Sequence, residues 1–583
     1  MVAINLGSFN TQNGRLTAGS VTSGLDSKAV IDAVLKSKET EIKTKKDNIT
    51  ANDKVISTLG TLKNLLSTFR TASNALRSPP GSANSSSDAF SFRNATVSSN
   101  TAISGSTYLS VSTDSSALVG NYSISNVVTA KAHTIRKDGF TDRTSSVVGA
   151  ALTFAAGNFT LNGTSITLAT GDSLSDIKFK INAVTDTTGV EADIVQVSSS
   201  SFSLILRSSE TGVTNDIDEY NEALNQIQFG ADIESFSEIS AGTDASFQIN
   251  GQTVTRSSNV IDDVIDNLTF TLLKNTPTPD DGTIVTASVT ADTTTVKNSV
   301  ITFINAYNDL KLFIAKQQER DNDGVLKDTA ILGNENSLDT IVNDISQHLN
   351  HSVTGLASGA LNTLAEIGIT FTDYAGDSEN PATANILTID DNKFDTQLSS
   401  SLDVLRRVFG FDFIANSSEI GVYERTNAAT ETSFKLDIDL TRASGNQIRV
   451  LNSATSAFLY NMDYADGLLS GKTGTDLEGL TIIYTGDDTA NITVTATQGI
   501  ADRLYNVLDT YLTDITGLVD LTIDKYADLN TRAEDEIERL DEFMTSEREY
   551  LIGRFSQLEA TVAKFNSVLD YFTALQSAQQ ANN

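Results

Sequence analysis

The longest regular pattern in the chain lies in residues 537–575, which read IERLDEFMTSEREYLIGRFSQLEATVAKFNSVLDYFTAL. Apolar side chains recur there at every seventh position, with further apolar side chains between them. The members of this predicted seam are Ile537, Leu540, Met544, Leu551, Leu558, Val562, Phe565, Leu569 and Phe572. An apolar stripe of period ~3.5 needs a partner helix to cover it. The stretch therefore predicts a long helix packed against another helix.

A matching stripe near the N-terminus offers that partner. Its members are Leu35, Ile42, Ile49, Ile56, Leu59, Leu62, Leu66 and Phe69. Because both stripes belong to one chain, the simplest arrangement pairs the two ends as an antiparallel helical leg and leaves the middle of the chain to form a head. We predict that the two stripes together form an assembly interface.

The charges beside the two stripes agree with this pairing. Residues 36–46 hold five lysines against two glutamates, and residues 534–549 hold eight carboxylates against two arginines. Exposed ion pairs contribute about 0–1 kcal/mol each, so they would set orientation more than stability. A fully buried large apolar side chain contributes about 1.5–3 kcal/mol. The alternative interpretation is that both charged stretches are solvated helix faces.

Composition excludes several classes of function. A chain of 583 residues is too long for one core and predicts roughly three to five domains. With 41 basic and 74 acidic side chains its net charge is −33, which argues against nucleic acid as a partner. There is no cysteine, which excludes disulfides, thiolate metal sites and a cysteine nucleophile. No apolar run approaches the ~18 residues that span a membrane, so no membrane insertion is expected.

The N-terminus gives no sign of a targeting segment. Residues 1–20 are polar and lack the apolar run of a secretory signal peptide, and residues 1–24 are expected to be mobile. By these rules alone the chain would be assigned to the cytoplasm.

Periodicity changes several times along the chain and predicts the α+β fold class. Helical spacing is expected over residues 27–77, 174–184, 295–318, 337–349, 398–409, 500–515 and 519–578. Alternation typical of strands dominates residues 90–292 and 411–498, with a further strand at 386–389. Asn162-Gly163 and Asn250-Gly251 each predict a tight hairpin. We therefore predict a multidomain protein with a terminal antiparallel coiled-coil or helical-bundle leg and inserted antiparallel β-rich head domains.

Three stretches resemble sites with chemistry, but each lacks an essential group. Gly471-Lys472-Thr473 has Asp466 where a phosphate-binding loop needs its first glycine. The stretch Glu319–Gly324 resembles the start of a calcium-binding loop but has Ala330 at position twelve, where the loop needs a bidentate glutamate. His348 and His351, with Asp344 one turn earlier, lack a further convergent ligand. We predict no catalytic residue, no metal site and no cofactor, and the alternative interpretations are turns and a helix C-terminus.

Several segments resemble the flagellar filament cap family, hook-associated protein 2 (FliD). The segments, in the family's order, are Ser23-Gly-Leu-Asp-Ser, residues 56–69, residues 174–212, residues 247–259, Phe303-Ile-Asn-Ala-Tyr-Asn, Gly499-Ile-Ala-Asp-Arg-Leu, Arg554-Phe-Ser-Gln-Leu-Glu and Phe565-Asn-Ser. Each piece is short, but the ordered set spans most of the chain. The resemblance implies a structural protein without enzymatic activity.

The resemblance also implies a location and partners. Family members sit extracellularly at the distal tip of the bacterial flagellum and are exported by the flagellar type III apparatus, so a signal peptide is not required. They form closed homo-oligomeric rings, often of five subunits. Their partners are other copies, flagellin, the filament end and a flagellar export chaperone. The cap helps flagellin to fold and insert during filament growth, which motility requires.

Together with the resemblance, the pattern changes give an expected domain map. Residues 1–45 and 530–583 are terminal coiled-coil segments, partly mobile, and residues 46–88, 293–410 and 499–529 form a helical leg domain. Residues 89–110 and 195–292 form a first β head domain, and residues 111–194 form a second. Residues 411–498 depart from the minimal family pattern and are expected to be an additional inserted β domain.

Two other classes remain open. Flagellin and the hook–filament junction protein also have helical ends around a β-rich middle, and growth of long filaments from pure protein would favour flagellin over a cap. A surface adhesin would bind a glycan or a host surface. Filament caps can also take part in cell adhesion, so binding alone would not exclude the cap.

Overall fold

The computed structural model describes residues 9–12, 15–18, 26–78, 88–115, 117–149, 153–217, 220–221, 226–229, 232–277, 282–356, 359–376, 385–426, 428–430 and 432–580. Residues 1–24, which are expected to be mobile, lie outside these ranges except for the short strand pair β1 (Phe9–Gln12) and β2 (Arg15–Ala18). The chain divides into two compact units. One contains residues 1–83 and 299–583, and the other contains residues 84–298.

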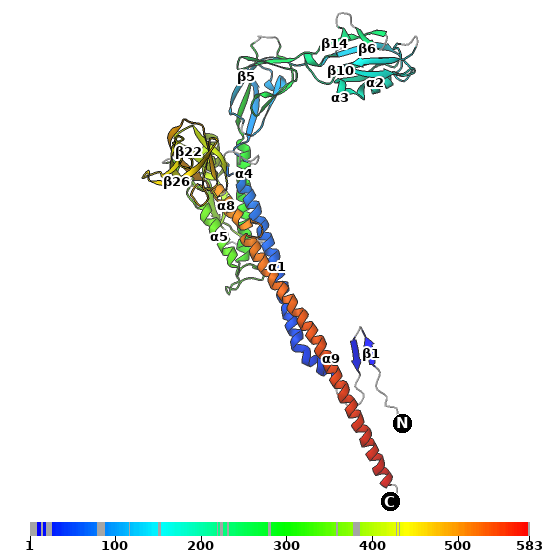
Figure 1. Ribbon diagram of the computed structural model, residues 1–583, viewed down its shortest axis with the longest axis vertical. Helices are drawn as coiled ribbons and strands as arrows, with labels where there is room; N and C mark the ends of the chain where they lie inside the picture. The colour runs from blue at the N-terminus through cyan, green and yellow to red at the C-terminus, as the bar shows by residue number, and fades with distance from the viewer. Residues whose placement is uncertain are drawn as a thin grey trace. The chain divides into compact units, whose positions relative to one another are not determined.

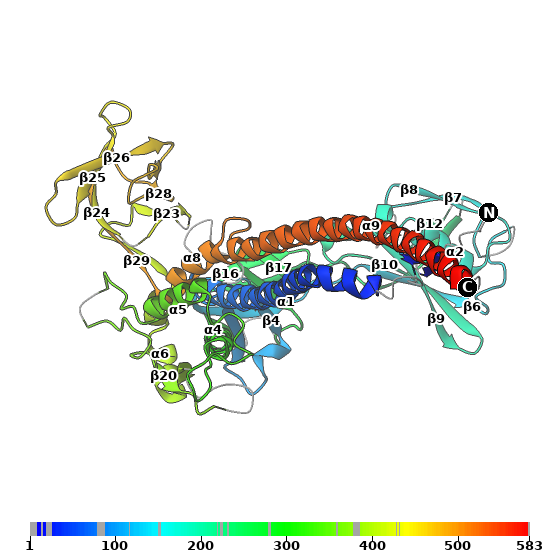
Figure 2. The ribbon, with the colours of Figure 1, turned by 90° about the horizontal axis from the view of Figure 1, so that it is seen from below.

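The first unit is built on two long antiparallel helices, α1 (Ser27–Asn74) and α9 (Leu518–Gln580), which lie side by side (Figures 1 and 2). The Asp26 carboxylate caps α1 by accepting a hydrogen bond from the Ala29 amide at 2.9 Å. Helix α1 ends at Asn74, before Pro79 and Pro80 in the sequence. Two successive prolines cannot continue a helix, so an end before them is expected. This pairing confirms the predicted antiparallel helical leg and the α+β fold class.

Shorter helices complete the upper leg. They are α4 (Thr293–Gln317), α5 (Asn336–Leu349), α6 (Asp391–Ser400), α7 (Leu402–Phe409) and α8 (Ile500–Leu512), with the hairpin β20 (Ile369–Asp373) and β21 (Asn385–Ile389) beside them. Aromatic rings form the centre of this bundle. Phe303 lies 5.1 Å from Phe69 and 6.0 Å from Phe409 between ring centroids.

The predicted helix 398–409 is wrong in its boundaries. The structure has two helices, α6 and α7, with the chain extended at Ser401, where φ is −158°. The hydroxyls of Ser399 and Ser400 bond back to the carbonyls of Asp395 and Thr396. Such local side-chain bonds compete with the helical ladder, which explains why a serine run ends α6.

Between α7 and α8 the chain forms an eight-stranded antiparallel module. The strands are β22 (Phe411–Ala415), β23 (Ile420–Arg425), β24 (Thr432–Asp439), β25 (Ile448–Asn452), β26 (Phe458–Ala465), β27 (Leu468–Ser470), β28 (Leu480–Tyr484) and β29 (Thr489–Gln498). Their order is β22-β29-β24-β25-β26-β27-β28-β23. One apolar cluster, which includes Phe434, Leu436, Val450 and Ile482, fills the module. Alternation of these side chains with polar ones is the pattern of a half-buried strand.

The second unit has two separate apolar cores. The first core joins the sheet β16-β15-β5-β19-β3 to the sheet β17-β18-β4. The strands are β3 (Arg93–Ser99), β4 (Leu109–Thr113), β5 (Gly120–Val128), β15 (Ala245–Ile249), β16 (Gln252–Arg256), β17 (Val260–Ile265), β18 (Leu268–Leu272) and β19 (Ile284–Ala291), with the short 3₁₀ helix η2 (Gly105–Thr107).

The second core contains the sheet β14-β6-β10-β9, the hairpin β7-β8 and helix α2. The elements are β6 (Thr134–Phe140), β7 (Gly157–Leu161), β8 (Thr164–Leu168), α2 (Leu174–Asn182), α3 (Thr185–Thr188), β9 (Val190–Ser198), β10 (Ser201–Ser208), η3 (Val213–Asn215) and β14 (Ser237–Ser240). The small sheet β11-β12-β13 comprises Tyr220–Asn221, Gln226–Phe229 and Asp232–Ser235. Ser173 and Asp176 form a capping box at the start of α2.

These cores correct the expected boundaries of the two head domains. Strand β5 was expected in the second head domain, but Tyr122 and Ile124 belong to the first core. Leu204 and Phe236 were expected in the first head domain, but they belong to the second core. The physical reason is strand pairing, since β5 is hydrogen-bonded between β15 and β19. Periodicity identifies strands but does not reveal their distant partners.

Both hairpins predicted from Asn-Gly pairs are present. Asn162 and Gly163 have φ values of 44° and 76°, and Asn250 and Gly251 have φ values of 48° and 80°. Two successive left-handed residues are what a tight type I′ turn requires. They join β7 to β8 and β15 to β16.

Candidate assembly interface

Four polar contacts fix the register of α1 against α9. They join Asp32 to Arg548 at 2.8 Å, Lys45 to Glu536, Asp53 to Asn530 at 2.7 Å, and Lys63 to Asp520 at 2.6 Å. Positions that advance along α1 retreat along α9, so the helices are antiparallel at a constant register. Since Asp32 lies opposite Arg548, the first residue of α1, Ser27, lies level with about residue 553 of α9.

The predicted charged flanks meet in part. Lys45 contacts Glu536 and holds the pKa of that carboxyl below its ordinary value. Other lysines of the basic flank pair within α1 instead, as Lys43 does with Asp47 at 2.6 Å. An ion pair between neighbouring turns of one helix loses less side-chain conformational entropy than an ion pair between two helices.

The predicted seam residues of α1 are covered within the single chain. Leu35, Ile42, Leu59, Leu62, Leu66 and Phe69 are buried, and Ile49 and Ile56 are half-buried. Helix α1 packs against α9 and α8, and the Phe69 ring also lies 5.1 Å from the Phe303 ring of α4, between centroids. These side chains therefore stabilise the leg of one chain, and their role in assembly stays a prediction.

The predicted seam residues of α9 fall into two groups. Ile537, Leu540, Met544, Leu551 and Val562 are half-buried. Leu558, Phe565, Leu569 and Phe572 are exposed by 44%, 70%, 65% and 62%. The second group is exposed because α9 continues for about 27 residues past the level of Ser27, where α1 begins. Val562 also lies past that level but is half-buried.

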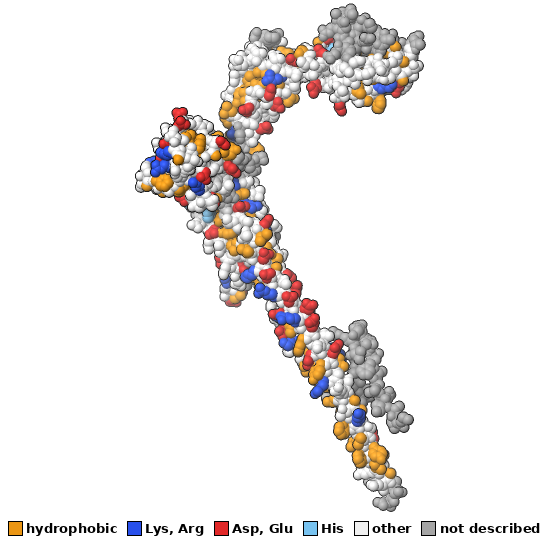
Figure 3. All heavy atoms as spheres, in the orientation of Figure 1, with side chains coloured by type: hydrophobic (Ala, Val, Ile, Leu, Met, Phe, Trp, Pro, Cys, Tyr) orange, Lys and Arg blue, Asp and Glu red, His pale blue; other side chains and the backbone are white. Residues whose placement is uncertain are grey.

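We call residues 558–575 of α9 the apolar tail. Val568, Tyr571 and Leu575 add to the exposed side chains of this segment, and Figure 3 shows hydrophobic side chains gathered along the C-terminal end of α9. Its charged side chains are Glu559, Lys564 and Asp570. An exposed apolar helix face of this extent is typical of a surface that binds a partner.

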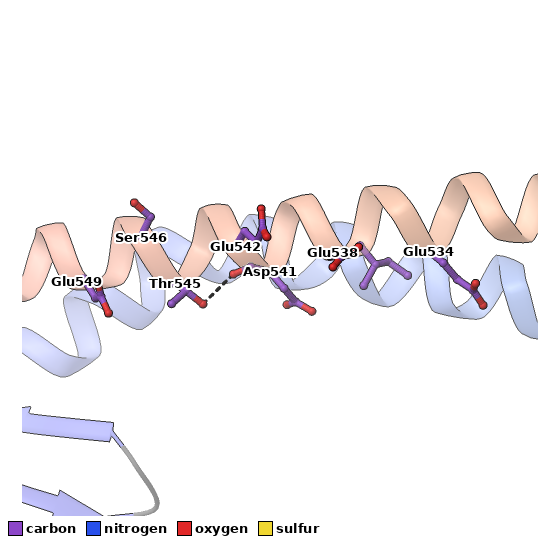
Figure 4. Close-up of a pocket in the computed structure, with 8 residues that line it drawn as sticks. Glu534, Glu538, Asp541, Glu542, Thr545, Ser546 and Glu549 are labelled. Atoms are coloured by element: carbon purple, nitrogen blue, oxygen red, sulfur yellow. Dashed lines mark hydrogen bonds between the residues drawn. The ribbon is translucent and has the colours of Figure 1, made fainter.

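The acidic flank of α9 forms a shallow hollow between residues 534 and 549. Figure 4 shows its lining, which comprises Glu534, Ile537, Glu538, Asp541, Glu542, Thr545, Ser546 and Glu549. All eight residues belong to α9, and five carry carboxylates. Like charges at this density repel an acidic surface, so the flank favours contact with water or with a basic partner.

A buried ionic network ties the eight-stranded module to the leg. Asp502, in the first turn of α8, has no solvent exposure. Its carboxylate accepts hydrogen bonds from Arg425 at 2.8 Å, from Arg77 at 3.1 Å and from Gln498 at 2.8 Å. Burial, the largest single influence, opposes ionisation of Asp502, but Arg425, Arg77 and Gln498 together outweigh it and hold the pKa of this carboxyl below its ordinary value.

Backbone hydrogen bonds also join the base of the module to the leg. The Phe411 amide donates to the Arg77 carbonyl at 2.9 Å, and the Gly499 amide donates to the Gly410 carbonyl at 2.8 Å. A Cβ atom at Gly499 would lie 2.3 Å from the Phe409 carbonyl carbon, so only glycine fits there. Residues 410 and 499 are therefore hydrogen-bonded neighbours at the base of the module.

No sequence pattern predicts this network. Arg77, Arg425 and Asp502 lie far apart in the sequence, and no local spacing connects them. One signal was available, since Asp502 interrupts an otherwise apolar face formed by Ile500, Ala501 and Leu504. A carboxylate on a buried helix face needs a cationic partner.

The motifs discounted from sequence have structural roles in the described chain. Lys472 pairs with Asp463 at 3.1 Å, and Asp321 accepts the amides of Asp323 and Val325 in a tight turn. His348 Nδ1 lies 2.7 Å from the Asp344 carbonyl oxygen, while Tyr511 donates to the Asp344 carboxylate. Within the described residues, no group of three or more His, Asp or Glu side chains is arranged to hold a metal ion.

None of the described helices combines the length and the hydropathy needed to cross a bilayer. Paired terminal helices, β modules inserted between them and an uncovered apolar helix end together define a structural assembly protein. Comparison with known families identifies which one.

The sequence matches three family models. Residues 23–133 match the flagellar hook-associated protein 2 N-terminus, residues 152–210 match the flagellin hook IN motif, and residues 242–567 match the flagellar hook-associated protein 2 C-terminus. The C-terminal match alone covers more than half of the 583 residues. The chain belongs to the flagellar hook-associated protein 2 (FliD) family, as its sequence segments indicated.

Two curated relatives support this assignment. Flagellar hook-associated protein 2 of Aeromonas caviae is 25% identical over 447 residues, which cover 73% of this chain and 87% of the relative. The Escherichia coli K12 protein of the same name is 30% identical over 370 residues, covering 60% and 72%. Among solved structures, the D1-D2-D3 domains of the E. coli flagellar cap protein FliD align with 21% identity and a TM-score of 0.46, covering 81% of this chain and 99% of that one.

Proposed function

We propose that this protein caps the distal end of a bacterial flagellar filament as a closed ring of identical subunits. Membership of the hook-associated protein 2 family supports the cap assignment. The observation that carries the mechanism is the apolar tail of α9, which extends past the start of α1 and exposes Phe565, Leu569 and Phe572. Burial of such side chains favours docking on a partner by about 1.5–3 kcal/mol each.

In this mechanism the leg supplies docking and the β modules supply the plate. The apolar tail docks on the filament end, while the ring holds the β modules above it. New flagellin then folds and inserts beneath the plate during filament growth. The apolar tail lies outside the internal core of the leg, where Phe69 packs against Phe303. Docking through the tail therefore leaves that core unchanged.

The finer features of the assembly are part of the same proposal. We expect five subunits in the ring, location outside the cell at the flagellum tip, export through the flagellar type III apparatus, and an export chaperone as a transient partner. No catalytic activity, nucleic acid partner or bound cofactor is expected. The net charge of −33 supports the absence of a nucleic acid partner.

Genetic complementation tests this function. In a strain of the source bacterium that lacks the gene, we expect flagellin to be lost to the medium and motility to be absent. The intact chain should restore filaments, and the Phe565→Asp variant should not. Restoration of filaments by Phe565→Asp, secreted at the normal level, would contradict docking through the apolar tail. Growth of long filaments by the purified chain alone would indicate a flagellin instead.

A further inference from the structure

Helix α9 has a glycine at the level where its partner helix begins. Gly553 lies level with Ser27, the first residue of α1, because Asp32 contacts Arg548 and the two helices run antiparallel. Before Gly553 the helix lies beside α1, and after Gly553 it continues past the start of α1 as a single helix (Figures 1 and 2). The glycine therefore marks the boundary between the covered and the uncovered parts of α9.

No steric requirement explains a glycine at this position. A Cβ atom at Gly553 would meet no heavy atom within 4 Å beyond the neighbouring backbone of its own helix, and the residue is helical, without a positive φ. Gly517, just before α9, differs, because a Cβ atom there would lie 2.5 Å from the Tyr511 carbonyl oxygen. Alanine favours a helix over glycine roughly fourfold to fivefold in the helix–coil equilibrium constant. Gly553 therefore weakens α9 without a gain in packing.

This weakness has its largest effect where α9 loses its partner. Before Gly553, half-buried side chains such as Met544 and Leu551 pack along the leg, so packing rather than propensity holds the helix. After Gly553, most apolar side chains of the tail are exposed, so the helix depends mainly on propensity. Gly553 is itself exposed to solvent, and water that enters the helical hydrogen-bond ladder favours a kink.

We propose that Gly553 is a hinge that positions the apolar tail for docking. This inference rests on the proposed docking of the tail on the filament end. Because α9 extends ~40 Å past Gly553, a bend of ~20° there would move its end by about 14 Å. The hinge lets Phe565, Leu569 and Phe572 turn toward the surface that receives them while the leg keeps its own packing. Docking then selects one of several directions of the tail.

Gly60 provides a matched control for this hinge. It lies inside α1 with α9 beside it, since Lys63 on the same helix contacts Asp520 of α9 at 2.6 Å. A Cβ atom at Gly60 would also meet no heavy atom within 4 Å beyond its own helix backbone. Gly60→Ala and Gly553→Ala therefore make the same chemical change in open space within a helix. Only Gly553→Ala makes it where the helix loses its partner.

Distance measurements on the full chain test the hinge. The chain has no cysteine, so Ser546→Cys and Ser577→Cys place two nitroxide labels at exposed positions on either side of Gly553. Pulsed electron paramagnetic resonance should show the ~46 Å separation of a straight helix together with shorter, bent separations. The bent fraction should fall about fourfold to fivefold in Gly553→Ala and stay unchanged in Gly60→Ala. A single straight separation with glycine at position 553 would overturn the hinge.

Hydrogen exchange measures the same opening without labels. The amides of residues 554–557 are released when the helix opens at Gly553, so they should exchange about fourfold to fivefold more slowly in Gly553→Ala. The same amides should exchange at the original rate in Gly60→Ala. Equal exchange rates in Gly553→Ala and in the original chain would overturn the hinge.

Complementation separates the hinge from the proposed function. Gly553→Ala, secreted at the normal level, should restore filaments up to about fivefold less well, because the bent population falls by that factor. Gly60→Ala should restore them fully. Equal restoration by both variants, with Phe565→Asp still inactive, would overturn positioning by Gly553 and leave the cap proposal intact. Restoration by Phe565→Asp would instead contradict docking through the apolar tail, on which the hinge depends.

Discussion

Asp502 is the residue on which the junction between leg and β module depends. A buried carboxylate is tolerated only with cationic partners, and here two arginines converge on it from the end of α1 and from β23. Arg77 also stacks on Tyr505 at 4.0 Å, so its removal would lose packing as well as charge. The network therefore fixes how the eight-stranded module packs on the leg, as much as it stabilises the fold.

Replacement of Asp502 by asparagine should lower the free energy of unfolding by about 3–5 kcal/mol, because Arg425 would remain buried without a countercharge. Denaturant unfolding followed by circular dichroism measures the change. Asp509→Asn is the matched control, since Asp509 pairs with Arg70 at 2.8 Å but is 36% exposed. The control should cost at most about 1 kcal/mol. Equal losses in both variants would refute the special role of Asp502.

The same residue predicts an acid dependence. The folded-state pKa of Asp502 lies below its ordinary value, so its contribution to stability is fully present above the unfolded-state pKa of about 4. That contribution is lost as pH falls through the folded-state pKa. The stability difference between wild type and Asp502→Asn should therefore be constant near neutral pH and shrink below about pH 4. A difference that persists unchanged at pH 2 would contradict the assignment.

Helices and hairpins were predictable because their signals are local. The heptad stripes gave α1 and α9, and the Asn-Gly pairs gave two hairpins with the required positive φ values. Strand partners were not predictable, because nothing in β5 indicates that it pairs with β15 and β19. The apolar tail was predicted as part of a seam. Its exposure follows from where α1 begins, which a stripe by itself does not reveal.

Substitutions in α9 should behave differently where the helix lies opposite α1 and where it continues past Ser27, the first residue of α1. Leu551→Asp should destabilise the leg, because Leu551 is half-buried opposite α1. Leu558→Asp should leave the melting temperature unchanged but abolish docking and motility, because Leu558 lies in the apolar tail. Thr561→Asp, on an exposed polar position of the same helix, controls for the added charge. Normal swimming of the Leu558→Asp strain would exclude the tail as a docking surface.

Deletion of residues 411–498 tests the expected inserted domain. Because Gly410 and Gly499 are hydrogen-bonded neighbours, a short Gly/Ser linker should join α7 to α8 without strain. The deletion also removes Arg425 and Gln498, which leaves Asp502 with Arg77 alone. The remaining Asp502–Arg77 pair is balanced in charge, so we expect the deletion variant to keep its helical circular dichroism on heating. Adding Asp502→Asn to the deletion should lower its melting temperature, because Arg77 would then lose its countercharge.

The excised segment provides the complementary measurement. It carries its own apolar core, so it should fold alone with a β-type circular dichroism spectrum and a cooperative melt. A disordered fragment, together with a collapsed leg in the deletion variant, would show that residues 411–498 belong to the common core. The domain map would then be wrong.

For the molecule as a whole, net charge opposes the proposed assembly and apolar surface favours it. Copies with a charge of −33 repel one another, and this repulsion is screened beyond about 10 Å at 0.1 M salt. Raising salt from low to moderate concentration should therefore shift the purified chain toward rings, as followed by sedimentation velocity. Dissociation of rings by the same increase would mean that complementary charges outweigh both the apolar contacts and the general repulsion.

Direct imaging of the purified full-length chain examines the proposed cap most simply. Negative-stain electron microscopy at micromolar concentration and moderate salt should show closed rings of one uniform size, with five subunits expected. The Phe565→Asp variant should retain rings held by the β modules if the apolar tail serves filament docking alone. Long filaments of the pure chain, or a strictly monomeric population at high concentration, would contradict the proposal that this protein acts as a filament cap.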